Sequence, residues 1–288
     1  MSKGERPVIT LTTDFGWQDP FVGVMKGVIL TIAPEVTIVD LTHAIDSHDI
    51  LGAALVLKSS YRYFPKGSIH VVVVDPGVGG ARRPMLATTS GYSFVGPDNG
   101  VLNPVLEGES ERRLFHLTER RYFLDPISNT FHGRDIFAPV AAWISRGVAA
   151  TELGEEVSSI VELRLPAVRK IAEKKWVGVI LRVDKFGNLI TNISETEFAE
   201  AFTRETEFLV NLGGHGVSGL RQFYSEALPG ELFVIWGSAG LLEISSNQAS
   251  AADILQADKN QQFTIEVLST PVGGALDSER REGRLPRS

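Results

Sequence analysis

Residues 75–83 read Asp-Pro-Gly-Val-Gly-Gly-Ala-Arg-Arg, and combine a carboxylate and two guanidinium groups with three glycines. Glycine permits backbone conformations and close approaches that a Cβ forbids, and proline fixes the exit from the preceding strand. We therefore expect a rigid loop that holds Asp75 near Arg82. The alternative is a glycine-rich turn whose arginines are solvated.

The same loop argues against two nucleotide-binding motifs. It lacks the Gly-Lys-Ser/Thr ending of a Walker loop. The dinucleotide fingerprint also fails, because Arg82 stands where its third glycine belongs. These departures indicate that NAD is not a cofactor.

Residues 131–135, Phe-His-Gly-Arg-Asp, place the imidazole of His132 just before a helical pattern. A histidine there tends to stay neutral, because the helix dipole disfavours its cation. The alternative makes Asp135 a helix N-cap and His132 an ordinary loop residue.

Two polar segments in the second half could contact a nucleobase. Residues 184–192 read Asp-Lys-Phe-Gly-Asn-Leu-Ile-Thr-Asn, and residues 238–247 read Ser-Ala-Gly-Leu-Leu-Glu-Ile-Ser-Ser-Asn. Amides and carboxylates are suitable hydrogen-bond partners for a base. A hairpin and a polar β-turn are the alternatives.

No metal or covalent-catalysis signature is present in the sequence. There is no cysteine, no His-Glu-x-x-His pair and no Gly-x-Ser-x-Gly elbow. We expect no metal site, with a metallohydrolase as the weaker alternative. The acidic and imidazole side chains that could form a metal site are Asp14, His43, His48, Asp49, Asp75, His132 and Asp135.

Alternating strand and helix patterns must position the first group of residues. Strand patterns cover residues 8–13, 36–41 and 69–74, and apolar residues at helical spacing follow Pro20, Asp49 and Asp135. This alternation predicts an α/β domain with a mainly parallel sheet. Ligands bind such sheets at the carboxyl ends of the strands, where Asp14, His43 and Asp75 fall.

The second half predicts a different architecture, a small antiparallel barrel or sandwich. We expect an α/β domain over residues 1–165, a linker over 166–175, a β domain over 176–267 and a disordered tail over 268–288. Strands are expected at 177–183, 188–193, 208–212, 232–236, 241–244 and 263–267, with a helix at 195–202.

Composition limits the classes of partner. The chain has 288 residues, and 28 Lys+Arg against 35 Asp+Glu give a net charge of −7. We therefore expect no nucleic-acid partner. No apolar run approaches the ~20 residues of a membrane span, and no signal peptide is visible, so we expect a cytoplasmic protein without membrane contact.

Five segments occur in the order expected of one family: residues 12–16 (Thr-Thr-Asp-Phe-Gly), 75–83, 131–135, 184–192 and 238–247. The sequence, over roughly residues 7–267, resembles the S-adenosyl-L-methionine (SAM) hydrolases, also called SAM hydroxide adenosyltransferases. Their relatives make 5′-fluoro- and 5′-chloroadenosine. The resemblance implies an N-terminal α/β domain, a C-terminal β-barrel-like domain and a homotrimer with active sites between subunits.

The resemblance also implies a reaction and its residues. SAM, the substrate, is hydrolysed without metal or cofactor to adenosine and L-methionine by an activated water that attacks C5′. The off-isomer at the sulfonium is a possible substrate. Asp75, Arg82 and His132 match the catalytic triad, in which Asp75 orients or accepts a proton from the water. Asp14 matches the ribose-binding aspartate, and the positions around adenosine are Asp184, Asn188, Ser238, Glu243, Ser246 and Asn247.

Two departures from the halogenating relatives favour water as the nucleophile. Those relatives have a non-acidic residue where Asp75 stands, and an arginine where Ala239 follows the serine. The alternatives are a halide-dependent adenosyltransferase and a non-catalytic regulatory protein that binds SAM or adenosine.

Overall fold

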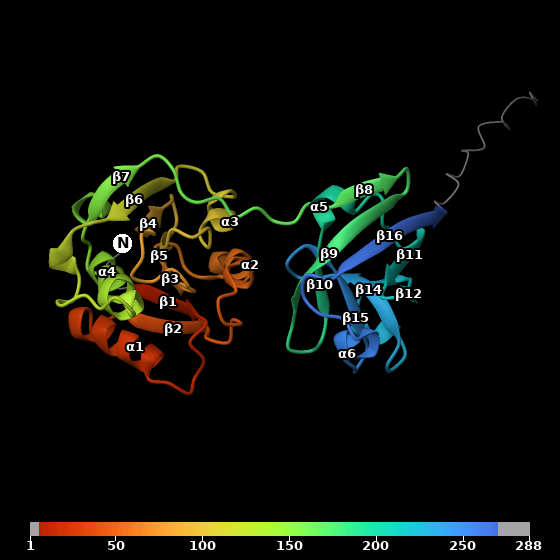
Figure 1. The fold of residues 1–288 in the computed structure, drawn as a ribbon, viewed down its shortest axis with the longest axis horizontal. Coiled ribbons are helices and arrows are strands. Elements are labelled where there is room, and N and C mark those ends of the chain that lie inside the picture. The colour runs from red at the N-terminus through yellow and green to blue at the C-terminus, as the bar shows by residue number, and fades with distance from the viewer. Residues whose placement is uncertain (1–5, 270–288) are drawn as a thin grey trace, which may run out of the picture. The chain divides into compact units, whose positions relative to one another are not determined.

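The structure is a computed structural model that describes residues 6–269. The chain divides into two compact units, Met1–Leu165 and Pro166–Ser288, which we call the N-terminal and C-terminal units. Figure 1 shows helices packed around a sheet in the first unit and a curled sheet in the second.

The N-terminal unit is built on a seven-stranded sheet in the order β2-β1-β3-β5-β4-β6-β7. Its central strand β3 is buried along its whole length, as the apolar run predicts for a strand covered on both faces. The strands are β1 (Val8–Thr13), β2 (Thr37–Thr42), β3 (Ile69–Val73), β4 (Pro84–Thr88), β5 (Ser93–Pro97), β6 (Arg113–Leu117) and β7 (Gly154–Val157).

The sheet is mixed. The pairs β2–β1, β1–β3 and β3–β5 are parallel, whereas the pairs β5–β4, β4–β6 and β6–β7 are antiparallel. The α/β class predicted from the sequence is confirmed. The antiparallel half was missed because its strands are only four or five residues long and lie among turns.

Helices cover both faces of this sheet (Figure 1). Helices α1 (Phe21–Ile32) and α4 (Ala138–Ser145) pack on the face that carries Val71 and Val73. Helices α2 (Ile50–Ser60) and α3 (Asn103–Leu106) pack on the face of Val72. Short helical turns lie at Tyr61–Tyr63, Arg120–Tyr122 and Ala150–Glu152, and a π-helical turn at Gly133–Phe137 precedes α4.

The C-terminal unit is a nine-stranded sheet that curls around one apolar core, and is thus barrel-like rather than a sandwich of two sheets. Its strands are β8 (Arg169–Ala172), β9 (Lys175–Val183), β10 (Leu189–Ser194), β11 (Glu207–Leu212), β12 (His215–Val217), β13 (Leu220–Arg221), β14 (Leu232–Trp236), β15 (Leu241–Ser246) and β16 (Gln262–Ser269). The helices are α5 (Glu195–Phe198), a turn at Tyr224–Glu226, and α6 (Ala251–Leu255).

Part of this unit has no signal in the sequence. The expected linker over residues 166–175 contains strand β8, which pairs antiparallel with β9. All four residues of β8 are exposed, so backbone hydrogen bonding rather than an apolar face forms this strand. The expected tail is also corrected at its start, since Leu268 and Ser269 belong to β16 and Ser269 pairs with Glu207. Residues 270–288 lie outside the described part.

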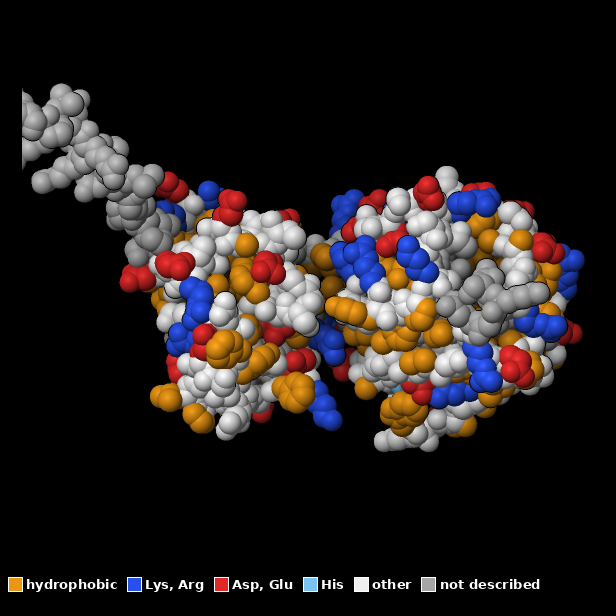
Figure 2. Space-filling model, turned by 180° about the vertical axis from the view of Figure 1, so that it is seen from behind, with side chains coloured by type: hydrophobic (Ala, Val, Ile, Leu, Met, Phe, Trp, Pro, Cys, Tyr) orange, Lys and Arg blue, Asp and Glu red, His pale blue; other side chains and the backbone are white. Residues whose placement is uncertain are grey.

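On the face shown in Figure 2, acidic and basic side chains are interspersed with apolar ones. Among the described residues, no helix is long and apolar enough to cross a membrane.

Candidate active site

The loop after strand β3 brings Asp75 and Arg82 into direct contact. The Arg82 Nε donates to both carboxylate oxygens of Asp75, at 2.9 and 3.0 Å, and Nη2 donates to Oδ2. The side chains are 5% and 9% exposed, so this is a buried charge pair in two-pronged geometry. The rigid-loop interpretation therefore describes the geometry better than solvated arginines.

Gly79 lets this loop pack closely against another segment. It has a φ of +76°, and a Cβ built on it would lie 2.1 Å from the carbonyl oxygen of Asn129. Any larger residue would push the 75–83 loop away from residues 128–130, which lead into His132. The glycine thus supports contact between the two parts of the candidate triad.

His132 completes a connected set of three side chains. Its Nδ1 lies 2.7 Å from Nη2 of Arg82. A guanidinium group can only donate, so Nδ1 must accept and the imidazole must be neutral with its proton on Nε2. Burial lowers the pKa of His132, and the Arg82 charge lowers it further against the opposing effects of Asp75 and Asp135. Burial, rather than the helix dipole, is the main cause.

Asp135 does not act as the helix N-cap that the alternative interpretation required. It lies inside the π-helical turn and is buried. Its carboxylate accepts from the backbone N–H of Ser128 at 2.8 Å and from Nε of Arg134 at 2.6 Å. Asp135 therefore fixes the segment that leads to His132.

Arg82 retains one nitrogen, with two N–H groups, that can donate to a further group. Its Nη1 is buried and has no partner among the described residues. The guanidinium carbon lies 5.4 Å from the centre of the Phe137 ring, so one side of the group faces an aromatic surface. A buried unpaired donor is costly, and a polar atom of a ligand or water would satisfy it.

Asp14 follows strand β1, next to β3 in the sheet. The two strands are parallel, so Asp14 and Asp75 both follow carboxyl ends at the same edge, as expected. Asp14 Oδ2 accepts from the backbone N–H of His48 at 2.9 Å. His48 has a φ of 68°, an uncommon conformation for a residue with a Cβ.

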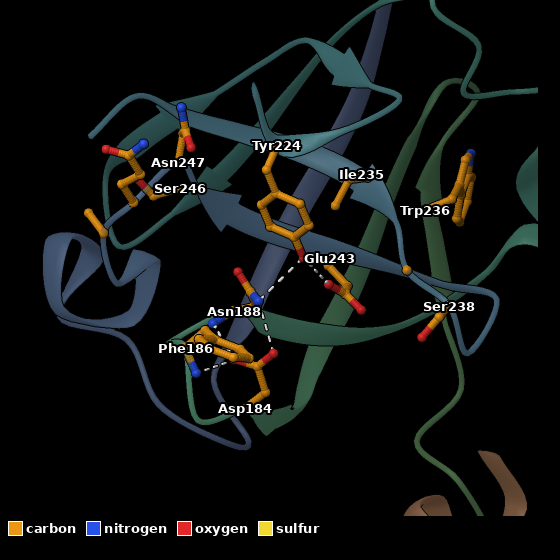
Figure 3. A pocket seen from close by; sticks show the side chains of 13 residues that line it. Asp184, Phe186, Asn188, Tyr224, Ile235, Trp236, Ser238, Glu243, Ser246 and Asn247 are labelled. Carbon is orange, nitrogen blue, oxygen red and sulfur yellow. Dashed lines mark hydrogen bonds between the residues drawn. The ribbon is translucent and has the colours of Figure 1, made fainter. Parts of the chain in front are cut away.

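The C-terminal unit contains a cavity of about 790 Å³, a size that suits a small-molecule ligand. Figure 3 shows side chains from β14 and β15, from the turn that precedes β10, and from the helical turn at Tyr224–Glu226 around it. All six residues that the resemblance places around adenosine line the cavity: Asp184, Asn188, Ser238, Glu243, Ser246 and Asn247.

Asp184 organises one wall of the cavity as a turn. Its Oδ1 accepts from the backbone N–H groups of Phe186 and Asn188, at 2.8 and 2.9 Å. The Asn188 amide donates to Oδ2 at 2.9 Å (Figure 3). Gly187 at the turn has a φ of +82°, and a Cβ there would lie 2.1 Å from Oγ of Ser250. The turn thus fixes Asn188 in one orientation.

Glu243 and Tyr224 form a second polar group, in which the Tyr224 hydroxyl lies 3.4 Å from Oε2 of Glu243. Burial raises the pKa of Glu243, and the charge of Asp184 raises it further. Burial and the Glu243 charge raise the pKa of Tyr224. A Cβ on Gly237 would lie 1.8 Å from Oε1, so this glycine makes room for the carboxylate.

Two further residues complete the polar lining. Ser246 Oγ is buried and has no partner among the described residues. The amide of Asn247 donates to the carbonyl of Ala227 at 2.7 Å, which leaves its oxygen as an acceptor. Both keep hydrogen-bonding capacity for a ligand.

Aromatic side chains in the lining were not predicted. Phe186 lies between two predicted residues, and Trp236 lies two residues before Ser238, where the second motif begins, so adjacency was an available signal. Tyr224 lies in a helical turn far from either motif, and only the fold brings it to the cavity.

In the described part of the chain, no group of three or more His, Cys, Asp or Glu side chains is arranged to hold a metal ion.

Two family models match the chain. The SAM hydroxide adenosyltransferase N-terminal domain matches residues 9–154, and the C-terminal domain matches residues 178–264. The chain is 37% identical to an (R)-S-adenosyl-L-methionine hydrolase of Thermus thermophilus, over 87% of this chain and 95% of the relative. It is 35% identical to the protein of that name in Salinispora tropica, over 90% and 97%.

A more distant relative and a solved structure are also similar to this chain. A fluorinase of an Actinoplanes species is 27% identical over 70% of this chain and 76% of the relative. The crystal structure of an uncharacterized conserved protein from Thermotoga maritima superposes with a TM-score of 0.84 at 33% identity, and covers 89% of this chain and 99% of that one.

Proposed function

The chain belongs to the SAM hydroxide adenosyltransferase family, and we propose that it is an enzyme that hydrolyses SAM to adenosine and L-methionine. The observation that carries the proposal is the connected set formed by Asp75, Arg82 and His132. These three side chains lie in the N-terminal unit, with Asp14 at a neighbouring strand end.

The reaction needs a positioned nucleophile more than an acid. An oxygen–carbon bond forms between water and C5′, the C5′–sulfur bond breaks, and methionine leaves as a neutral thioether. The remaining proton of the water is released. Since the leaving group is neutral, no general acid is required on that side.

Each triad residue has a role that its contacts support. Asp75 orients the water and accepts its proton, Nε2–H of His132 donates to the same water, and the free Nη1 of Arg82 stabilises hydroxide character. A carboxylate is a far weaker base than hydroxide, so orientation must supply much of the rate, and it can contribute ~7–11 kcal/mol.

Adenosine is held by the cavity of the C-terminal unit, and Asp14 binds the ribose. Asn188 offers an oriented amide, and Ser246 offers a hydroxyl without a protein partner. The aromatic surfaces of Phe186 and Trp236 supply flat apolar area for a base. We assign Asp184, Ser238, Glu243 and Asn247 to the same site.

Water, rather than halide, is the nucleophile. Asp75 places a negative charge at a position where the halogenating relatives have a non-acidic residue, and Ala239 stands where those relatives have an arginine after the serine. The intact triad also supports turnover over a purely regulatory protein that binds SAM or adenosine.

The finer assignments rest on the relatives. The hydrolases that this chain resembles carry the name of the (R) isomer, and we propose (R)-SAM as the preferred substrate. A homotrimer with active sites between neighbouring subunits is proposed on the family resemblance alone. SAM is the substrate, and no cofactor is proposed. The cytoplasmic location stays a prediction.

Chromatography of the enzyme with each SAM isomer tests the function. We expect adenosine and methionine in equal amounts, formed faster from (R)-SAM. The same reaction in high chloride should contain no 5′-chloroadenosine. Accumulation of 5′-chloroadenosine would favour the halide-dependent alternative, and no product from either isomer would favour the regulatory one.

A further inference from the structure

His43 is a buried histidine outside the triad with a polar partner on each ring nitrogen. Its Nδ1 lies 2.9 Å from Oγ1 of Thr13, and its Nε2 lies 3.0 Å from Oδ1 of Asp40. The side chain is 0% exposed, so these contacts are made away from water. The hydrogen bond to Thr13, together with the close carboxylate of Asp40, favours one orientation of this buried imidazole.

The hydrogen bond to Thr13 is the one that orients the imidazole. Nε2 of His43 lies at ion-pair distance from the Asp40 carboxylate, but these two atoms do not meet hydrogen-bond geometry. The Thr13 hydroxyl already accepts from the backbone N–H of Phe15 at 3.2 Å. Its own proton is therefore available to Nδ1. The arrangement runs from a carboxylate through an imidazole to a hydroxyl, but Thr13 is fully buried and has no access to a substrate.

The chain of contacts ends at the turn that carries Asp14. The carbonyl of His43 also accepts from the backbone N–H of Gly16 at 2.8 Å, on the other side of Asp14. Trp17 covers the imidazole edge-on, with ring centres 4.7 Å apart. His43 thus contacts the turn twice, through its side chain at Thr13 and through its carbonyl at Gly16. Asp14 lies between these two residues in the sequence.

The other end of the contact chain is anchored as well. Asp40 lies in β2 and accepts from Nζ of Lys26, in α1, at 2.5 Å. The position of His43 is therefore fixed by a strand and a helix of the N-terminal unit rather than by a loop alone.

We propose that His43 is a positioning residue that acts through Thr13 to hold the Asp14 carboxylate in place for the ribose hydroxyls. The inference rests on the proposed function, because it takes Asp14 as the ribose ligand. It predicts that the loss of the His43 side chain weakens recognition of the ribose specifically, and not of the nucleoside as a whole.

The measurement is the preference for adenosine over 2′,3′-dideoxyadenosine, taken as the ratio of their dissociation constants by calorimetry. Hydrogen bonds to a charged carboxylate should give the wild-type protein a preference of roughly tenfold or more. Asp14→Ala should abolish it. His43→Leu should reduce it to about threefold or less, mainly through weaker adenosine binding, and raise KM for SAM more than it lowers kcat.

Two variants separate positioning from loss of fold. Thr13→Val removes only the hydroxyl and should reproduce the effect of His43→Leu. His43→Asn places an amide oxygen near the position of Nδ1 and should restore most of the preference. In an Asp14→Ala background, neither Thr13→Val nor His43→Asn should change the ribose preference, because the carboxylate that His43 positions is then absent.

His70 provides a matched control. It is also a buried histidine whose Nδ1 bonds a threonine hydroxyl of β1, Thr10, at 2.8 Å, but this contact lies four residues before Asp14. His70→Leu should leave the ribose preference unchanged.

The outcomes distinguish this inference from the proposed function. If His43→Leu and Thr13→Val both keep the wild-type preference while Asp14→Ala loses it, the role of His43 is overturned and the ribose role of Asp14 stands. A wild-type preference in Asp14→Ala would overturn the ribose role of Asp14 and this inference with it. Formation of adenosine from SAM tests the hydrolase independently of both.

Discussion

Replacement of Asp75 by asparagine is the sharpest test of the proposed mechanism. The substitution keeps the shape of the side chain and removes its charge. In the structure, both carboxylate oxygens accept from Arg82. An asparagine can present one oxygen, and its NH₂ group then faces a guanidinium that can only donate.

The magnitude follows from these contacts. One hydrogen bond to a charged group is worth about 1.5–3 kcal/mol, or roughly 10- to 150-fold in rate if it acts in the transition state. The variant also loses the acceptor for the proton of the water. We therefore expect kcat to fall at least about 100-fold, equivalent to ~2.7 kcal/mol.

The assay is adenosine formation under single-turnover conditions, beside calorimetric binding of adenosine. Affinity for adenosine should change by less than about threefold, because the adenosine cavity lies in residues 184–249. Asp98→Asn is the matched control. Asp98 is 3% exposed and pairs with the adjacent Arg83, so the substitution breaks a similar ion pair without touching His132.

Combination with His132→Ala tests whether the triad acts as a unit. The contact chain from Asp75 through Arg82 to His132 implies non-additive losses, so the double variant should be far more active than the product of the single losses predicts. A wild-type rate in Asp75→Asn, or the same loss in Asp98→Asn, would refute the role given to Asp75.

Four further outcomes are expected. Asn188→Ala should weaken adenosine binding roughly tenfold by calorimetry, since a buried hydrogen-bond partner is worth ~1–3 kcal/mol; unchanged affinity would remove Asn188 from the site. Burial lowers the pKa of His70 to about 4, so the contribution of His70 to the free energy of unfolding should be constant above pH 6.5 and fall by roughly 3 kcal/mol as the pH drops from 6.5 to 4. In urea titrations, His70→Leu should flatten this dependence. Adenosine formation should persist in EDTA, and activity lost to EDTA and restored by one divalent ion would contradict metal independence. Light scattering should give three times the 31.4 kDa of one chain, and an active monomer would contradict the trimer.

Much of the fold was predictable because the strongest patterns reflect burial. The run at 69–74 predicted a strand covered on both faces, and β3 is buried throughout. Asp49 was expected to begin a helix, and its carboxylate accepts from the backbone N–H of Gly52 at the start of α2. In both segments the residue types alone predict the local structure.

The sequence was less informative where structure depends on pairing with distant segments. Strand β8 has no buried residue and exists through its ladder with β9. Tyr224 reaches the cavity only because the fold places its turn beside β15. The sequence placed Asp75 near Arg82, but the contact between Arg82 and His132 depends on how two loops pack, which no local pattern encodes.

The buried pairing of Arg82 with Asp75 has a consequence for how this active site can evolve. A neutral residue at position 75 leaves a guanidinium that is 9% exposed without its counter-charge, a situation that costs about 3–5 kcal/mol in other proteins. A lineage that moves from water toward another nucleophile by changing residue 75 first would therefore pass through an unstable intermediate. Directed evolution toward such chemistry should accordingly randomise positions 75 and 82 together, because neither position can drift alone.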